Sequence, residues 1–485
     1  MTWLPRTLYL IGCWLLLFTL LQVIPAFYAL VMGQTTIFSG FLLSIFINGF
    51  VGSTLYLGFK GSKRSKSLRA MILLPILTVA LTGMGTALPF VFIYAETPFS
   101  LMVFEGISLI TTMGSSALRE GVTESYALVL WRALASWCGG LGVLVIALTF
   151  LMRVNVGAMQ MYPSFFAKGN KGAALGSISS VGKLLLKPYL LFTLIIVFMF
   201  LLAGDPFKLA VIRGLSVIAS AGIAMPDQTS TAVSGLGLQI VYCLVMTAVV
   251  INVDVLYGLF QAKEKRKGYK SIEFKVLPQF IFWGLGALIL IHYLTDSRIS
   301  LLDLYFMFVS SMSTMGISLA SWDPMSAASM SSSIIFMAFA LIGGGVLTTS
   351  GGMRQMRFLI LVAQGRSELS RLAHPNGVHA LKFGRRTIEN HDLHAVWLLV
   401  AGFLITFVLG SVLLSIFGNP VEDSVAMTIA ALTTSGDLVT IVSPYFPGYY
   451  GLEAAEYYIL SLIMLIGRLD TTLIFILFAG IFWRR

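Results

Sequence analysis

Hydrophobic residues occupy the chain in long runs that are separated by short polar segments. A run of about 20 apolar residues forms a helix that can cross a hydrocarbon core roughly 30 Å thick. Four long runs are each followed by a second run of only about ten residues, which is too short to span and predicts a re-entrant helix. The long runs cover residues 71–94, 188–203, 276–292 and 395–416, and the short runs cover residues 101–110, 210–219, 302–312 and 425–432.

Each short run ends in small residues that include a glycine, and a full-length apolar run is then expected to return through the membrane. These glycine segments are TTMGS at 111–115, ASAGI at 219–223, STMGI at 313–317 and TTSGD at 433–437. The glycines recur about every hundred residues, a period longer than that of soluble repeat proteins and natural for a repeated membrane unit. The pattern predicts four pore units, in residues 67–168, 169–268, 269–374 and 375–485.

We therefore predict an all-α polytopic membrane protein in which four pseudo-symmetric units surround one central pore. Each unit consists of a helix, a re-entrant pore loop and a second helix. Two earlier apolar runs, at 8–31 and 37–59, supply two extra transmembrane helices in residues 1–66. Backbone that is not helical is tolerated at membrane depth only where protein or a water-filled cavity satisfies it. Four re-entrant segments that meet at one axis fulfil this condition, because their carbonyl groups can face a wetted lumen.

The residue types in the glycine segments indicate a cation filter. Glycine reaches left-handed backbone angles without steric cost, so the carbonyl groups around it can turn toward the axis. Rings of carbonyls replace the hydration shell of a monovalent cation, and each short helix directs its carbonyl end at the pore. The hydroxyl residue two positions before each glycine either adds a ligand or fixes the strand. The predicted filter consists of Thr112, Met113, Gly114, Ser220, Ala221, Gly222, Thr314, Met315, Gly316, Thr434, Ser435 and Gly436.

Three residues in this pattern need separate interpretation. The side chains of Met113 and Met315 can point away from the axis, since only backbone carbonyls need to face the ion. Asp437 directly follows the last glycine. Two interpretations of its carboxylate stay open: an additional outer cation site, or an acceptor for backbone amides behind the filter.

Composition and charge place the chain in a membrane and argue against nucleic acid as its partner. The chain is 57% hydrophobic and 11% charged, with a mean hydropathy of +0.90 and a net charge of +11. The basic residues cluster between the units, so by the positive-inside rule these clusters and both termini lie on the cytoplasmic side. The clusters at 171–187, 263–275 and 366–386 are candidate surfaces for membrane lipid or for a protein partner.

Motifs of other function classes are missing from the sequence. It contains no His-Glu-x-x-His, no Gly-x-Ser-x-Gly and no Walker loop, so we do not expect an enzyme. Cys13, Cys138 and Cys243 lie inside apolar runs at unrelated spacings, which indicates packing and not a disulfide or transition-metal site. An ion-coupled secondary transporter is the alternative from another class, although inverted repeats would not give every unit the same orientation.

Five longer stretches match a known family. They are FEGISLITTMGSSA, WRALASWCGGLGVLVIAL, VLTTSGGMRQMRFLIL, HPNGVHALKFGR and the terminal LIMLIGRLDTTLIFILFAGIFWRR. In these stretches the chain resembles the membrane subunit of the Trk, Ktr and HKT superfamily of potassium transporters, TrkH type. The resemblance implies potassium as the transported ion, a homodimer in the bacterial cytoplasmic membrane, and a cytosolic nucleotide-binding regulatory subunit of the TrkA type. A sodium-conducting or poorly selective channel of the same fold is the alternative, and symport with H⁺ or Na⁺ stays open.

The resemblance also implies a gate below the filter. Residues 343–352 would interrupt the second helix of the third unit as an intramembrane loop, in keeping with their poor helix propensity; close helix packing through small residues is the alternative. Arg468 would act as an electrostatic barrier, hold the loop closed, or anchor its helix by pairing with Asp470 or Glu456. Asp254 either pairs with Arg468 or Arg354 or is hydrated near the cytoplasmic end. The implied gate residues are Gly343, Gly344, Gly345, Ser350, Gly351, Gly352 and Arg468.

Overall fold

The computed structural model describes residues 4–62, 68–118, 125–151, 178–223, 233, 235–251, 253, 272–297, 299–374, 382–383, 386–387, 390–443 and 445–469. This part of the chain is helical, apart from a short antiparallel pair formed by β1 (Lys382–Phe383) and β2 (Arg386–Thr387). Seven of the described helices are long and apolar enough to cross a membrane. The prediction of an all-α polytopic membrane protein is confirmed.

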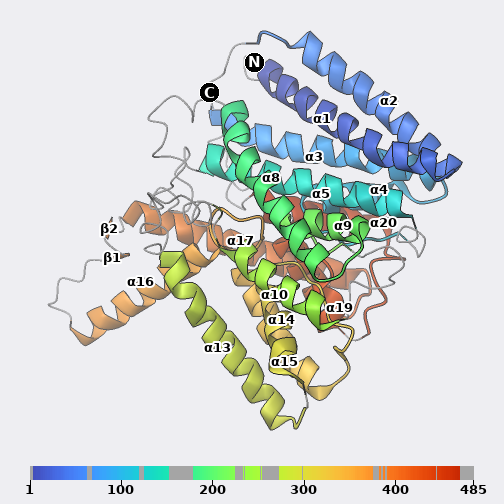
Figure 1. Cartoon of the computed structure of the whole chain (residues 1–485). Coiled ribbons are helices and arrows are strands. Elements are labelled where there is room, and N and C mark those ends of the chain that lie inside the picture. The colour runs from blue at the N-terminus through green and yellow to red at the C-terminus, as the bar shows by residue number, and fades with distance from the viewer. Residues whose placement is uncertain are drawn as a thin grey trace.

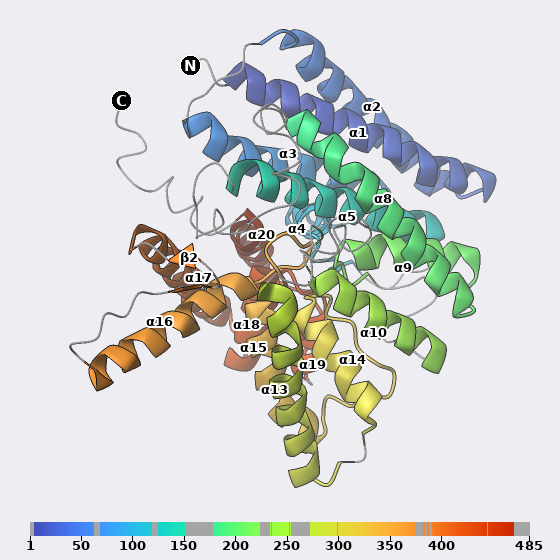
Figure 2. The same ribbon diagram turned by 60° about the vertical axis from the view of Figure 1, so that its left-hand side comes forward.

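Two long helices precede the repeated units, as the apolar runs predict. They are α1 (Leu4–Val31) and α2 (Thr35–Gly58), which lie side by side at one edge of the molecule (Figures 1 and 2). Glycine allows their close approach, because a Cβ atom added to Gly12 would lie 2.8 Å from the amide nitrogen of Tyr56 and 2.9 Å from the carbonyl oxygen of Gly52. Small residues at a helix contact are a common means of association in membranes.

The four units follow the predicted plan of a long helix, a short helix and a returning helix. In the first, second and fourth units, the short helix follows a proline: Pro98, Pro206 and Pro420. In the third unit, the short helix follows Ser300, whose hydroxyl accepts a hydrogen bond from Asp303 N at 3.2 Å. Proline suits a helix start because its ring fixes φ and it has no amide hydrogen to leave unpaired. The first unit consists of α3 (Leu68–Ile93), α4 (Phe99–Ile110) and α5 (Tyr126–Ile146), continued by the π-helical turn η1 (Ala147–Leu151), and the second consists of α8 (Ile178–Leu202), α9 (Phe207–Ile218) and α10 (Leu236–Val250). The third unit consists of α13 (Ile272–Leu294), α14 (Leu301–Met312), α15 (Ala327–Ile342) and α16 (Gln355–Ala373). The fourth unit consists of α17 (Asn390–Ile416), α18 (Val421–Thr433), α19 (Leu438–Val442) and α20 (Ala454–Leu469).

The returning helices differ from the prediction in their length. The sequence predicts a full-length return in every unit, but only α5, with 21 residues, meets this within the described chain. The helices α10 and α15 have 15 and 16 residues, whereas α20 is described only as far as Leu469, so the full-length return of the fourth unit stays a prediction. α15 ends at Gly343, which has a φ of +68°, and the chain resumes a helical path only at α16. The expected interruption of the third unit is therefore present.

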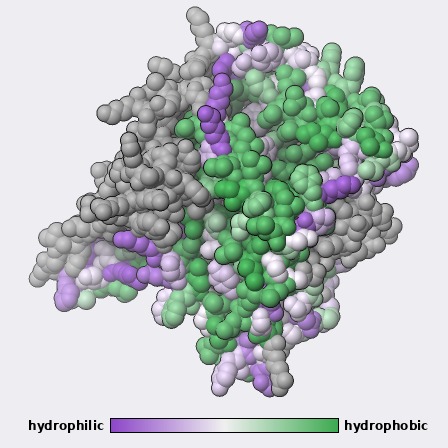
Figure 3. All heavy atoms as spheres, in the orientation of Figure 1, coloured by the Kyte–Doolittle hydropathy of each residue, from purple (hydrophilic) through white to green (hydrophobic). Residues whose placement is uncertain are grey.

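The outer helices expose apolar side chains, and the short helices are buried among them. Figure 3 shows hydrophobic residues over the middle of one face and hydrophilic residues near its edges. Phe46 on α2 and Trp283 on α13 are each 72% exposed, which suits contact with lipid. In contrast, most residues of α4 and α18 are buried. The four short helices thus form the centre of the fold, where their carboxyl-terminal ends come together.

A buried polar chain connects the amino-terminal helix pair to the first unit. Ser44 Oγ on α2 donates a hydrogen bond to Gln22 Oε1 on α1 at 3.2 Å. Asn48 Nδ2, also on α2, donates to Ser44 Oγ at 3.3 Å and to the carbonyl oxygen of Gly85 on α3 at 2.9 Å. Hydrogen bonds between helices help to fix helix packing where the surroundings are apolar.

We expect Asn48→Ala to destabilise the protein by about 1 kcal/mol, because it removes the link between α2 and α3. The measurement is the midpoint of thermal unfolding in detergent micelles. Ser39→Ala is the matched control, because the exposed Ser39 hydroxyl donates a hydrogen bond of 2.9 Å to Thr36 O within its own helix. Equal midpoints for the two variants would contradict a role for this polar chain.

Candidate cation filter and gate

The four glycine segments lie against one another at the centre of the molecule. A Cβ atom added to Gly114 would lie 3.0 Å from the amide nitrogen of Gly222. One added to Gly222 would overlap the carbonyl oxygen of Met315, and one added to Gly436 would lie 2.6 Å from the same oxygen. A Cβ atom on Gly316 would lie 2.7 Å from an amide nitrogen of the fourth unit. Side chains therefore do not fit at these positions, and glycine is required by the close approach of backbone to backbone.

The residue two positions before each glycine has the same unusual backbone conformation in all four units. Positive φ is uncommon outside glycine, yet Thr112, Ser220, Thr314 and Thr434 have φ angles of +62°, +56°, +56° and +50°. They account for four of the six non-glycine residues with positive φ in the described chain. Such strained conformations persist where the surroundings over-determine them and tend to cluster at functional sites. In each unit this residue turns the chain sharply away from the end of the short helix.

The second glycine segment departs from the other three. Gly114, Gly316 and Gly436 have positive φ, as predicted, but Gly222 does not, so the prediction of a left-handed glycine is wrong at this position. The cause is a rotated peptide group. The carbonyl oxygen of Ala221 accepts a hydrogen bond from the hydroxyl of Ser216 on α9 and another, at 3.0 Å, from the amide of Ile223. This oxygen is therefore turned toward α9.

A serine six residues before the glycine holds the segment in three of the four units, a feature that the sequence analysis missed. Ser108 Oγ on α4 donates to Ser115 O at 2.8 Å, and Ser310 Oγ on α14 donates to Ile317 O at 2.6 Å. Ser216 occupies the corresponding position in the second unit, and Ala430 occupies it in the fourth. The constant spacing to the glycine was the signal that could have identified these serines.

Met113 and Met315 present their carbonyl groups to the centre while their side chains pack elsewhere. Both side chains are fully buried in the hydrophobic core. A Cβ atom added to Gly436 would lie 3.0 Å from Met113 O and 2.6 Å from Met315 O. Backbone oxygens, not thioethers, thus approach the axis at these positions.

Asp437 lies at the outer end of the fourth segment and is half-buried. It begins α19, but its side chain makes no capping hydrogen bond with that helix. Its carboxylate lies close enough to Tyr449, in the loop before α20, to influence that phenol. Burial raises the pKa of Tyr449 well above its ordinary value, and the negative charge of Asp437 raises it further. Asp437 therefore does not cap α19 with its side chain, and both interpretations of its carboxylate stay predictions.

The loop between α15 and α16 lies against the deeper end of the glycine segments. Thr349 Oγ1 donates to Ile218 O at 2.8 Å and lies 3.0 Å from Ser220 Oγ, both in the second unit. The amide of Gly351 donates to Thr314 Oγ1 at 2.8 Å. A Cβ atom added to Gly351 would overlap a carbonyl oxygen of the fourth unit, so glycine is needed for this approach. The loop thus contacts three of the four units.

The same loop is folded on itself by hydrogen bonds. Arg354 Nη1 donates to Gly345 O at 3.1 Å, and Gln355 N donates to Gly344 O at 3.0 Å. Gln355 Nε2 donates to Gly343 O at 3.3 Å. The hydroxyls of Ser350 and Thr348 lie 2.7 Å apart. Gly343 and Gly352, at the two ends, have φ angles of +68° and +80°. Residues 343–352 therefore form a compact, hydrogen-bonded loop between α15 and α16.

Arg468 connects the loop to the fourth unit. Arg468 is buried, with an exposed fraction of 6%; its Nη2 donates to Thr349 O at 2.6 Å and its Nη1 donates to Thr434 Oγ1 at 3.4 Å. The alternative pairing with Glu456 is not observed, because that carboxylate accepts hydrogen bonds from Asn419 and from the amide of Glu453. Asp254 and Asp470, the other suggested partners, lie outside the described residues, as do parts of the three basic clusters.

Arg468 occupies a position that the first unit fills with glycine. A Cβ atom on Gly139 of α5 would overlap the carbonyl oxygen of Ile110, and one on Gly467 of α20 would overlap that of Leu432. Ile110 and Leu432 each stand four residues before the glycine of their segment. The next residues, Gly140 and Arg468, therefore correspond, and the arginine is placed below the segments by the same helix contact.

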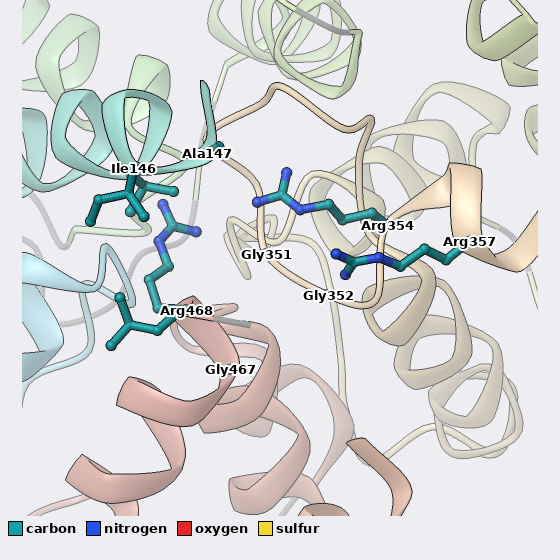
Figure 4. Close-up of a pocket in the computed structure, with 10 residues that line it drawn as sticks. Ile146, Ala147, Gly351, Gly352, Arg354, Arg357, Gly467 and Arg468 are labelled. Carbon is teal, nitrogen blue, oxygen red and sulfur yellow. The ribbon is translucent and has the colours of Figure 1, made fainter. Parts of the chain in front are cut away.

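Below the loop lies a small cavity of about 20 Å³, enough for a water molecule. The side chains of Arg354 and Arg357 extend across it toward Arg468 (Figure 4). Three guanidinium groups thus come close together beneath the glycine segments. The cavity is lined by Val143, Ile146, Ala147, Gly351, Gly352, Arg354, Arg357, Gly467, Arg468 and Leu469.

Comparison with known proteins gives matches over nearly the whole chain. The family model for TrkH, described as a cation transport protein, matches residues 39–282 and 274–485. The Trk system potassium uptake protein TrkH of Salmonella typhimurium is 27% identical over 490 residues, which cover 98% of each chain. TrkI of Halomonas elongata is 24% identical and covers 86% of this chain and 84% of its own length.

The fold agrees with a solved structure. The crystal structure of the potassium transporter TrkH from Vibrio parahaemolyticus superimposes with a TM-score of 0.87 at 24% sequence identity, and the match covers 99% of this chain and 100% of that one. Together with the family match, these findings show that this chain belongs to the TrkH family of cation transport proteins.

Proposed function

We propose that this chain carries potassium into a bacterial cell across the cytoplasmic membrane, through a filter formed by its four glycine segments. The observation that carries the proposal is the fourfold repeat of a positive-φ hydroxyl residue and a glycine two positions later, with the four segments in contact. Passages lined by backbone carbonyls replace the hydration shell of a monovalent cation. Relatives that are named potassium uptake proteins match nearly the whole chain.

The loop at 343–352 and Arg468 serve as the gate in this proposal. The loop binds residues at the deeper end of three segments, so an ion that leaves the filter inward meets it directly. Arg468 holds the loop through Thr349 O and adds a positive charge at the same place. A buried positive charge repels a cation most strongly where the dielectric constant is low. The loop must move, and Arg468 must release it, before ions pass.

The helix α16 offers a means of control from the cytoplasm. It begins directly after the loop, at Gln355, and projects from the body of the molecule (Figures 1 and 2). A cytosolic nucleotide-binding subunit that binds α16 or its neighbours would therefore pull on the loop itself. Assembly of this chain as a homodimer belongs to the same proposal.

Gly114→Ser is expected to lower the selectivity for potassium over sodium, because the new Cβ atom would lie 3.0 Å from Gly222 N and displace the segment. The measurement is the reversal potential of liposomes that hold the protein under opposed potassium and sodium gradients. Gly204→Ser is the control: Gly204 also has positive φ, at +95°, but has open space around its Cβ position.

If the reversal potential of the native protein equals the equilibrium potential of sodium, a sodium-conducting channel is favoured. No cation flux at all, with the regulator supplied, would contradict the proposed function. If Gly204→Ser altered selectivity as much as Gly114→Ser, the effect would come from general backbone strain and not from the filter.

Arg468→Gln is expected to raise the potassium flux roughly tenfold, because a hydrogen bond from a charged group contributes about 1.5–3 kcal/mol and its loss favours the open loop. The measurement is uptake of a rubidium tracer by liposomes at equal protein content. Arg371→Gln serves as control, since Arg371 is exposed and pairs with Glu368 three residues before it. A flux that is unchanged or lower in Arg468→Gln would exclude the gating role.

A further inference from the structure

A buried ion pair lies directly behind the first glycine segment. Glu105 is on the short helix α4 and is fully buried, and Arg132 is on the returning helix α5 and is 4% exposed. Arg132 Nη1 donates a hydrogen bond to Glu105 Oε2. The two helices that frame the first segment are thus joined by opposite charges in a site that water does not reach.

Both members of the pair also bind the segment itself. Arg132 Nη2 donates to the carbonyl oxygen of Gly114 at 2.8 Å. Glu105 Oε1 accepts hydrogen bonds from the amide of Ala117 at 2.7 Å and from the hydroxyl of Ser116 at 2.6 Å. Three residues within a stretch of four are therefore tied to the pair, and hydrogen bonds to charged groups are the stronger kind. The Gly114 carbonyl is held toward α5.

The other units fill the corresponding position differently. Nine residues before the glycine, the second unit has Arg213 and the third and fourth have Met307 and Met427, which are fully buried. Arg213 pairs with Asp205 at the start of α9 at 3.0 Å and faces the ring of Tyr242. Its pair with Asp205 thus ties the middle of the second short helix to the residues just before that helix, and its described contacts do not include a glycine segment.

Packing alone does not explain the charges at Glu105 and Arg132. Burying two charges is costly, and a buried ion pair contributes little net stability compared with apolar residues of similar size. The fold accepts methionine at the same position in two other units. Apart from the bond between them, Glu105 and Arg132 direct their hydrogen bonds at the first glycine segment. The pair is therefore well suited to fixing the conformation of that segment.

We propose that Glu105 and Arg132 are positioning residues that set the selectivity of the filter by holding the first glycine segment rigid. This proposal rests on the proposed function of the segments as a potassium filter. With Gly114, Ser116 and Ala117 fixed, the carbonyl of Met113 keeps its distance from the axis. The ring of carbonyl oxygens that faces the ion then cannot contract around sodium, which is smaller than potassium. Sodium therefore loses more hydration energy than these carbonyls replace. The first segment is the rigid reference against which the other three pack.

The test compares Arg132→Lys and Glu105→Gln with the matched pair Arg213→Lys and Asp205→Asn. All four variants weaken a buried ion pair on a short helix, but only the first two reach a glycine segment. The measurements are the reversal potential of liposomes under opposed potassium and sodium gradients and the midpoint of thermal unfolding in detergent. We expect Arg132→Lys and Glu105→Gln to lower the potassium-to-sodium permeability ratio at least roughly tenfold, and the control pair to leave the ratio unchanged while lowering the midpoint to a similar extent.

An unchanged permeability ratio in a folded, conducting Arg132→Lys or Glu105→Gln protein would overturn the proposal. So would an equal loss of selectivity in the Arg213 and Asp205 variants, because the effect would then follow from stability alone. If Arg132→Lys does not fold, Glu105→Gln makes the same comparison with a side chain of the same shape. If the native protein itself carries no potassium-selective current, the proposed function fails together with this inference. If the native protein is selective but the two variants are equally selective, only the inference about Glu105 and Arg132 fails.

Discussion

The structure depends on how four stretches of non-helical backbone are accommodated at membrane depth. Their amide and carbonyl groups cannot be left to lipid, since each unsatisfied group would cost several kcal/mol. The four glycine segments solve this by lying against one another, with the short helices behind them and serine hydroxyls bonded to their carbonyls. The short helices are placed in turn by the prolines at their starts and by the glycines that let α5 and α20 pack closely on α4 and α18.

The four units share the same backbone conformation at the hydroxyl position, but the side chains around that position differ from unit to unit. The positive φ at the hydroxyl position is common to all units, but the hydroxyls have different partners. The hydroxyls of Ser220, Thr314 and Thr434 bond to the loop or to Arg468, whereas the Thr112 hydroxyl has no hydrogen-bond partner within the described chain. One chain that carries four unequal units can give each unit a separate task, which four identical subunits cannot do. Here the first unit is anchored by charges, the third supplies the loop, and the fourth supplies the arginine that holds it.

The loop and the segments are mechanically linked through the same residues. A displacement of the loop breaks hydrogen bonds to the hydroxyl residues that turn the chain below the filter. In the proposed mechanism, opening changes the support of the segments at their deeper end, while Ser108, Ser310 and the Glu105 pair continue to hold their outer end. Under this proposal, the loop that moves and the segments that select the ion share some of their contacts but not all of them.

The sequence by itself determined the two extra helices, the short helices and the four glycine segments, because run length, small residues and constant spacing are local properties that reflect the bilayer and the backbone. The break after Ile342 was implied by the family resemblance, in keeping with the poor helix propensity of a glycine-rich segment. The rotated peptide at Ala221, the length of α10, and the contacts of Arg132 and Arg468 were decided only by the tertiary structure. Each depends on groups that are distant in the chain, as with Arg468 and Thr349, and a hydrogen bond between such groups forms only where packing brings them within about 3 Å.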